Sequence, residues 1–316
     1  MSSSGTLPRT DTAKPYQRPG DRVFAGSALG AGVLILVVLA GVAAFLLYEA
    51  WPALTAPSEE LPGQQSLASY VGPLVFGTLL SAALALLLAT PLAVGIALFI
   101  SHYAPRRLAQ GLGYVVDLLA AVPSIIYGLW GLSVLAPRTA GLSTWLEAHL
   151  GFLPFFAGPA SATGRTMLTI GVVLAVMILP IITAVSREVF LQTPRLHEEA
   201  ALALGATRWE MIRVAVLPFA RSGIVSAAML GLGRALGETM AVLMILSPGF
   251  LYSFKLLEAG QQQTIAANIA AQFPEANPLG VSALIATGLA LFVITLVVNM
   301  AARAIVARRK DFSGAN

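Results

Sequence analysis

Long apolar segments dominate this sequence and limit what it can fold into. Six of them, each near the ~20 residues that a helix needs to cross a bilayer, are separated by polar connections. They cover residues 23–48, 75–100, 113–135, 167–190, 222–246 and 281–306. Because 57% of the 316 residues are hydrophobic and only 11% are charged, a soluble domain is excluded. The expected fold class is an all-α, polytopic membrane helical bundle with six transmembrane helices.

The basic residues give this bundle an orientation. With the amino terminus placed in the cytoplasm, fifteen of the 19 lysines and arginines fall on the cytoplasmic side. Arg138, Arg165 and Lys255 fall outside, and Arg234 lies within an apolar stretch. An excess of basic residues in cytoplasmic connections is typical of membrane proteins, so both termini are expected inside. The net charge of +4 follows this sidedness and does not indicate a nucleic-acid partner.

The two ends of the chain are expected to be tails. Residues 1–22 are polar and predict a mobile cytoplasmic tail, and residues 306–316 predict a second one. The first apolar stretch, within residues 23–50, is too long for the core of a signal peptide and predicts an uncleaved membrane helix. The chain has no cysteine, and His149 has no second ligand at metal spacing, so neither a metal nor a cofactor is expected.

The third apolar stretch contains several helix-modifying residues. Pro123, Ser124 and Gly128 predict a kinked and closely packed helix. Asp117 lies about one turn inside the cytoplasmic edge of this stretch. Its carboxylate is expected either to reach the membrane interface or to form a structural ion pair.

A charged segment at residues 193–218 separates the fourth and fifth apolar stretches. Thr193, followed by proline, predicts the start of a short helix, and Gly205 suits a left-handed residue that ends it. Thr207–Glu210 has the spacing of a capping box, so a second helix is expected to begin there, with Pro218 as its limit. The segment therefore predicts a compact helix-turn-helix outside the bilayer.

This segment resembles the cytoplasmic EAA loop of binding-protein-dependent ABC importer permeases. The sites that carry the resemblance are Glu199, Ala200, Ala201, Gly205, Leu217 and Pro218. Ala215 stands where the pattern usually has isoleucine. The resemblance implies that a surface groove on a separate ATPase receives this loop. The alternative is an amphipathic connection that merely joins two helices.

Arg234 and Glu238 are the charged residues of the fifth apolar stretch. Arg234 lies about 12 residues, or roughly 18 Å, past the start of the stretch and hence near the membrane centre. Glu238 would lie one turn further on the same helix face, where Gly231, Gly233 and Gly237 permit close packing. Because a central arginine is costly, the pair indicates either an oxyanion path or an ion pair that only holds helices together.

Three segments together resemble the permeases of phosphate importers of the PstC type. They are the 122–130 segment of the third stretch, residues 203–209 of the charged loop, and residues 233–240. The resemblance covers nearly the whole chain. It implies a type I ABC importer permease core at residues 72–305, preceded by an accessory transmembrane helix at residues 23–50. It also implies a bacterial cell membrane location and a path for inorganic phosphate that includes Arg234 and Glu238.

The same resemblance implies partners. They are a sister permease of the PstA type, an ATP-binding subunit dimer of the PstB type and an extracytoplasmic phosphate-binding protein of the PstS type, all beside membrane lipid. The chain has no nucleotide-binding P-loop and no catalytic constellation, so it is expected to be a transporter subunit and not an enzyme. The alternatives are the PstA-like sister permease itself, a permease for another oxyanion, a secondary transporter, or a membrane scaffold without transport.

Overall fold

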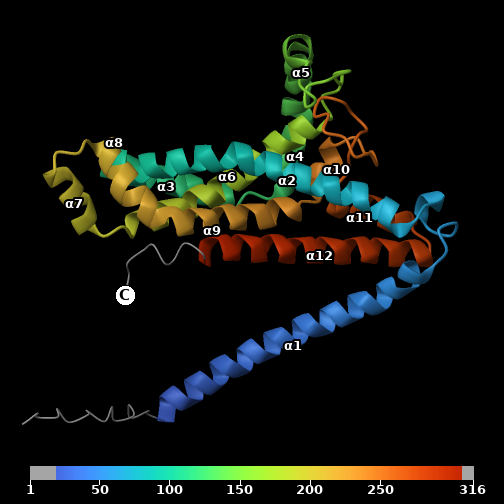
Figure 1. The fold of residues 1–316 in the computed structure, drawn as a ribbon, viewed down its shortest axis with the longest axis horizontal. Coiled ribbons are helices and arrows are strands. Elements are labelled where there is room, and N and C mark those ends of the chain that lie inside the picture. The colour runs from blue at the N-terminus through green and yellow to red at the C-terminus, as the bar shows by residue number, and fades with distance from the viewer. Residues whose placement is uncertain (1–18, 308–316) are drawn as a thin grey trace, which may run out of the picture. The chain divides into compact units, whose positions relative to one another are not determined.

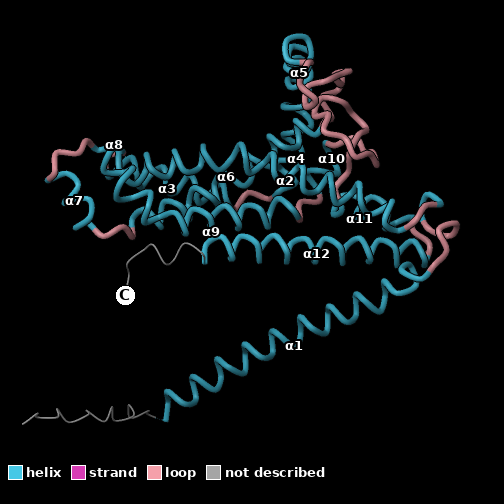
Figure 2. The backbone as a smooth tube through the Cα atoms, in the orientation of Figure 1, coloured by secondary structure: helices cyan, strands magenta, loops and turns pink. Residues whose placement is uncertain are grey.

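The computed structural model describes residues 19–307, and within that range the chain forms helices joined by turns and loops, with no strand (Figure 2). The two expected tails, residues 1–22 and 306–316, lie for the most part outside the described residues. The chain divides into two units, Met1–Tyr48 and Glu49–Asn316, which are described separately here.

The described α-helices are, in chain order, α1 (Pro19–Thr55), α2 (Leu67–Leu98), α3 (Arg106–Ala120), α4 (Ser124–Trp130), α5 (Ala136–Leu150), α6 (Met167–Leu191), α7 (Arg195–Ala203), α8 (Arg208–Met211), α9 (Leu217–Leu236), α10 (Met240–Ile245), α11 (Ile265–Gln272) and α12 (Pro278–Ala307). Wider π-helical turns follow α2, α4 and α8, at Phe99–Tyr103, Gly131–Leu135 and Ile212–Val216. Five helical segments are long and apolar enough to cross a membrane, and a bent pair, α3 with α4–α5, brings the number to six. The all-α membrane fold is thereby confirmed.

The first unit consists of most of α1. No described side chain before Glu49 is buried, and the helix is apolar around its circumference. A helix that is apolar on all sides is typical of a membrane span in contact with lipid. The helix begins at Pro19, a few residues before the expected start.

The core of the second unit lies where α2, α6 and α9 run side by side (Figure 1). The face of α2 in this core carries small residues at helical spacing, namely Ala82, Ala85, Ala89 and Ala93. Small side chains let membrane helices approach closely, and buried side chains of α6 such as Ile178 complete this cluster. A hydroxyl contact crosses the interface, since Thr183 Oγ1 lies 3.5 Å from Ala93 O.

The third apolar stretch is broken more sharply than a kink. Helix α3 ends at Ala120, α4 begins at Ser124, and the axis turns by 90° between them. Pro123 explains the break, because it has no N–H to donate and disfavours helical geometry at the residue before it. Beyond the turn, α5 rises away from the parallel helices (Figure 1).

The fifth apolar stretch is also arranged differently from the expectation. Helices α8 and α9 form one helical segment, Arg208–Leu236, that passes through Pro218. Pro218 therefore does not limit the second helix of the loop, and that prediction was wrong. The π-helical turn just before the proline, closed by Leu217 N–H to Ile212 O, relieves the clash between the ring and the preceding turn. The segment then ends at Leu236, and α10 begins at Met240.

Candidate functional site

The two helix breaks meet at one place in the bundle. Helices α4 and α10 pack against each other just after their respective breaks (Figure 1). The contact depends on glycine, because a Cβ atom on Gly128 would lie 3.0 Å from Ala241 Cα. A Cβ atom on Gly131 would lie 2.5 Å from Ile245 Cδ1 and 2.7 Å from Val173 Cγ2. This close packing fixes the two short helices relative to each other.

Arg234 is held at the broken end of α3. Its Nη1 donates to Ala120 O at 3.3 Å and its Nη2 to Val122 O at 3.5 Å. The last carbonyls of a helix have no partner within it and carry partial negative charge, so a cation there is stabilising. The Tyr127 hydroxyl donates to Leu119 O at 2.9 Å and binds the same helix end from α4. Two side chains from other helices thus bind the backbone carbonyls at the end of α3 and in the break.

Glu238 lies in the second break, between α9 and α10, and its side chain binds the backbone at the start of α10. Its Oε1 accepts a hydrogen bond from Ala241 N at 3.0 Å, and the residue is only 7% exposed. Within the described residues, no ion pair joins it to Arg234. The expectation of one shared helix face was wrong, because that spacing holds only in a continuous helix and α9 ends at Leu236.

The glycines around Arg234 differ in what they contact. Gly231 packs against α6, where an added Cβ atom would lie 2.8 Å from Ile182 Cδ1. Gly233 is exposed, and an added Cβ atom there would meet nothing within 4 Å. Gly237 is exposed as well. The close packing expected for all three is therefore confirmed within this chain only for Gly231. The surface beside Arg234 is open.

This arrangement has the chemistry of an anion site. A guanidinium has five N–H donors in a planar fork, and the two contacts to the α3 carbonyls use two of them. Non-helical backbone at membrane depth occurs where protein covers it or where it lines a water-filled cavity. The half-buried Arg234 next to exposed Gly233 and Gly237 therefore presents a fixed positive charge to whatever occupies the open surface.

The charged loop has the local structure that the sequence predicts at two positions. Gly205 follows α7 with a φ of 85°, which confirms the left-handed residue. Thr207 and Glu210 form the capping box, with Thr207 N–H donating to Glu210 Oε2 at 2.8 Å and Glu210 N–H donating to Thr207 Oγ1 at 3.3 Å. The expected cap at Thr193 was wrong by one residue. Helix α7 is preceded by Pro194, and the buried Thr193 hydroxyl has no partner among the described residues.

The side chains of the EAA-like loop divide into two groups. Glu199, Ala200 and Pro218 are exposed, whereas Ala201 and Leu217 are half-buried against an apolar cluster that contains Ile212. The exposed group is accessible from outside the chain, and the half-buried group attaches the loop to the helices.

Two polar contacts lie near this loop. The first was not expected from the sequence, and the second involves Asp117, for which the sequence left two interpretations open. His102 Nε2 lies 3.6 Å from Glu198 Oε1, which is the carboxylate next to the one singled out by the motif. Arg187 Nη2 lies 3.9 Å from Asp117 Oδ2, which favours the ion-pair interpretation of that acid. Neither partner could be identified by spacing, because each lies on another helix far along the chain.

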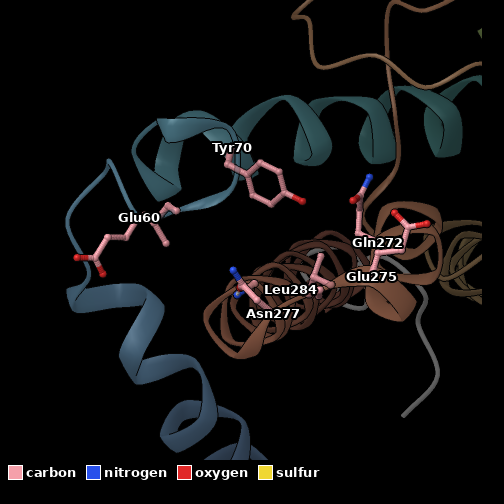
Figure 3. A pocket seen from close by; sticks show the side chains of 9 residues that line it. Glu60, Tyr70, Gln272, Glu275, Asn277 and Leu284 are labelled. Carbon is pink, nitrogen blue, oxygen red and sulfur yellow. Dashed lines mark hydrogen bonds between the residues drawn. The ribbon is translucent and has the colours of Figure 1, made fainter.

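A separate pocket of about 270 Å³ lies between the start of α2 and the start of α12 (Figure 3). Two of its polar groups already have partners: the Tyr70 hydroxyl accepts from Asn268 at 2.8 Å, and Asn277 Oδ1 accepts from Gly280 N at 2.7 Å. The carboxylate of Glu60 points away from the other labelled side chains. Within residues 19–307, no group of three His, Cys, Asp or Glu side chains is placed to hold a metal ion.

Comparison with known proteins identifies the family. Residues 89–311 match the model of the binding-protein-dependent transport system inner membrane component. The chain is 50% identical over 303 residues, 91% of this chain and 92% of the relative, to the phosphate transport system permease protein PstC 2 of Mycobacterium bovis. It is 40% identical to PstC of Mesorhizobium japonicum, over 93% of this chain and 92% of the relative.

A solved structure has the same fold. A chain of a bacterial ABC transporter that imports the acidic polysaccharide alginate superposes with a TM-score of 0.61 at 17% identity, covering 92% of this chain and 97% of that one. The family match begins within α2, so α1 lies outside it. The chain therefore belongs to the family of binding-protein-dependent transport system inner membrane components, in the group of permease proteins named PstC.

Proposed function

We propose that this chain forms half of the translocation pathway of an ATP-driven importer for inorganic phosphate. The observation that carries the proposal is Arg234, a fixed cation at the meeting point of two broken membrane helices, with an open surface beside it. The names of the relatives, which cover more than nine tenths of this chain, support phosphate as the substrate.

Arg234 receives the phosphate. A guanidinium binds phosphate oxygens through two parallel N–H bonds, a geometry that a lysine does not match. Phosphate then either uses the remaining donors or displaces the long contacts to Ala120 and Val122. Either way the cation keeps a partner throughout, which avoids an unpaired charge in a low dielectric.

Glu238 acts on the same pathway through the backbone. Its carboxylate holds the start of α10, the helix that packs on α4 beside Arg234. A buried carboxylate near the pathway also repels an anion that remains there too long, which favours release.

The loop at residues 193–218 couples the pathway to ATP hydrolysis in a separate subunit. Its exposed face includes Glu199, and Leu204 is 90% exposed, an unusual state for a leucine that meets no partner. Glu199→Arg should therefore release the ATPase, or uncouple hydrolysis from transport, while the chain remains inserted. Unchanged co-purification and coupling in that variant would remove the loop from this role.

The remaining half of the pathway comes from a sister permease, and an extracytoplasmic phosphate-binding protein delivers the substrate. Both termini lie in the cytoplasm, as the distribution of basic residues favours. The chain has no natural cysteine, so single introduced cysteines report sidedness without background. A cysteine at Ser58 should react with an impermeant reagent from outside, and one at Ser313 only after permeabilisation. The reverse pattern would overturn the orientation.

Reconstitution of the candidate subunits in vesicles tests the whole proposal. ATP-dependent uptake of radiolabelled phosphate should require this chain, the sister permease, the ATPase and the binding protein together. Unlabelled sulfate and molybdate in excess should leave the rate unchanged, and competition by either would assign another oxyanion. Uptake by this chain alone, driven by an ion gradient, would favour a secondary transporter.

A further inference from the structure

We infer that His102 positions the coupling helix α7 by holding Glu198, and so links α7 to the membrane core through α2. This inference rests on the proposed coupling role of the loop. It concerns residues that the EAA motif does not include, since His102 lies at the end of α2 and Glu198 precedes the motif glutamate.

Helix α7 has few attachments to its own chain. None of its side chains is buried. Its half-buried Ala201 contacts the apolar cluster around Ile212, and its remaining neighbours are α8 and the turn that follows α8. Within the described part of the chain, the ion pair between Glu198 and His102 ties α7 to the π-helical turn that follows α2.

His102 is itself held in place by two groups besides Glu198. Its Nδ1 lies 2.7 Å from Ser101 Oγ, which lies 2.8 Å from Ala97 O; when this hydroxyl donates to Nδ1, the Nε2 atom that faces Glu198 carries the ring N–H. The imidazole ring meets Phe190 edge to face, with centroids 6.5 Å apart. Phe190 is wholly buried. The imidazole is 9% exposed on its side chain, so it has little freedom to follow Glu198 if that residue moves.

The wider turn at the end of α2 helps to set this geometry. His102 lies in the π-helical turn Phe99–Tyr103, which rotates the last residues of α2 relative to a regular helix. Helix α2 then shares its alanine face with α6 along the core. A displacement of α7 is in this way transmitted to the two helices that form the centre of the bundle.

The contact between His102 and Glu198 orients α7 and adds little to the free energy of unfolding. A partly exposed ion pair or hydrogen bond contributes little to folding, and the 3.6 Å separation is not a short one. The adjacent Glu199 provides the comparison: it is exposed, and within the described residues its side chain forms no ion pair. Of two neighbouring carboxylates, Glu198 faces the permease and Glu199 faces outward.

The first arm of the test measures the position of α7 in the assembled complex. Spin labels on cysteines that replace Leu196 in α7 and Leu108 in α3, both exposed, report the distance between these helices. His102→Ala and Glu198→Gln should broaden or shift the distance distribution, and His197→Ala, a change at an exposed residue of the same helix, should not. His102→Gln keeps an N–H donor at this place and should restore the original distribution.

The second arm measures coupling, as phosphate transported per ATP hydrolysed. His102→Ala and Glu198→Gln should lower this ratio by about threefold, the size expected for one exposed polar contact, and His102→Gln should recover most of it. Amounts of assembled complex should be equal in all variants, which separates positioning from a loss of folding.

The distance measurement and the transport measurement can contradict the inference and the proposed function independently. An unchanged distance distribution in His102→Ala would overturn the inference, whatever happens to transport. A wild-type complex that moves no phosphate would overturn the proposed function, while the distance measurement would still decide whether His102 positions α7. A ratio that falls equally in His102→Ala and His102→Gln would show that the N–H donor is not what matters, and would also overturn the inference.

Discussion

The chain interrupts its helices in the charged loop at residues 193–218 and within its apolar stretches, and it caps the free ends by different means. In the loop, Gly205 turns the backbone and the Thr207–Glu210 capping box begins the next helix, all within a few residues. In the membrane, the end of α3 is capped by Arg234, 114 residues away along the chain.

Solvent accounts for the difference. Every helix end leaves N–H or C=O groups without a partner. In contact with water these groups are hydrated, so a local cap only adds to what the solvent supplies. At membrane depth an unpaired carbonyl is costly, and a side chain from another helix must reach it. A break inside the membrane is therefore also a contact between distant segments, and a change on either side affects both.

Removal of Arg234 should give the largest effect. Arg234→Ala leaves Ala120 O and Val122 O without their partner, at about 1–3 kcal/mol for a buried group, and removes the proposed phosphate ligand. We expect phosphate uptake to be abolished, and Arg234→Lys, which keeps charge but not the planar fork, to be impaired. Uptake is measured together with the amount of assembled complex.

Arg138 is the matched control for this experiment. It also donates to a backbone carbonyl, Val134 O at 2.8 Å, but that carbonyl is in its own exposed turn. Arg138→Ala should leave uptake unchanged. Normal uptake by Arg234→Ala would remove Arg234 from the pathway, and a failure of that variant to assemble would mean that capping α3 is its main role.

A methyl group at Gly131 should have the next largest effect. It would meet Ile245 and Val173 at the contact between the helices that follow the two breaks, and overpacking of this kind costs about 1–3 kcal/mol. We expect Gly131→Ala to lower the thermal stability of the complex. Gly233→Ala has open space and should not, so a loss of uptake in Gly233→Ala at normal stability would assign that face to the pathway or to the sister permease.

Two substitutions of Glu238 separate the effect of its charge from the effect of its hydrogen bond to the start of α10. Glu238→Gln keeps an oxygen for Ala241 N–H, whereas Glu238→Ala loses the cap of α10, which is worth about 1 kcal/mol. We expect lower stability for the alanine variant and near-normal stability for the glutamine variant, by thermal denaturation in detergent. In the glutamine variant, phosphate should be released more slowly. Equal stability of both would show that the hydrogen bond does not matter to α10.

The smallest effect is expected at the local cap. Thr207→Ala removes the hydroxyl that accepts from Glu210 N–H, at about 0.5–1 kcal/mol for an exposed cap. Hydrogen exchange should become faster at the amides of α8 and stay the same in α3. Faster exchange in α3 would contradict the separation between local and long-range caps.

The contrast between local caps and caps from distant segments also explains which features the sequence could predict. The left-handed Gly205 and the capping box could be read because their signals lie within ten residues. The break at Gly237–Thr239 could not, because apolar residues continue on both sides of it and no proline marks it. Pro123 indicated a kink, but not its 90° extent or the bonds that Tyr127 and Arg234, from other helices, make to the carbonyls at the break. Pro218 predicted a helix end that the structure does not have, because the π-helical turn before it lets the helix continue.

The uninterrupted segment from Arg208 to Leu236 joins the two kinds of helix end. One end carries the capping box, and the other carries Arg234, about 40 Å away along the axis. A tilt of this segment by about 5° moves its far end by roughly 3.5 Å, which is about the length of the hydrogen bonds that hold the guanidinium. Under the coupling role proposed above, such a tilt imposed on the loop by an ATPase would be large enough to separate Arg234 from the carbonyls of Ala120 and Val122.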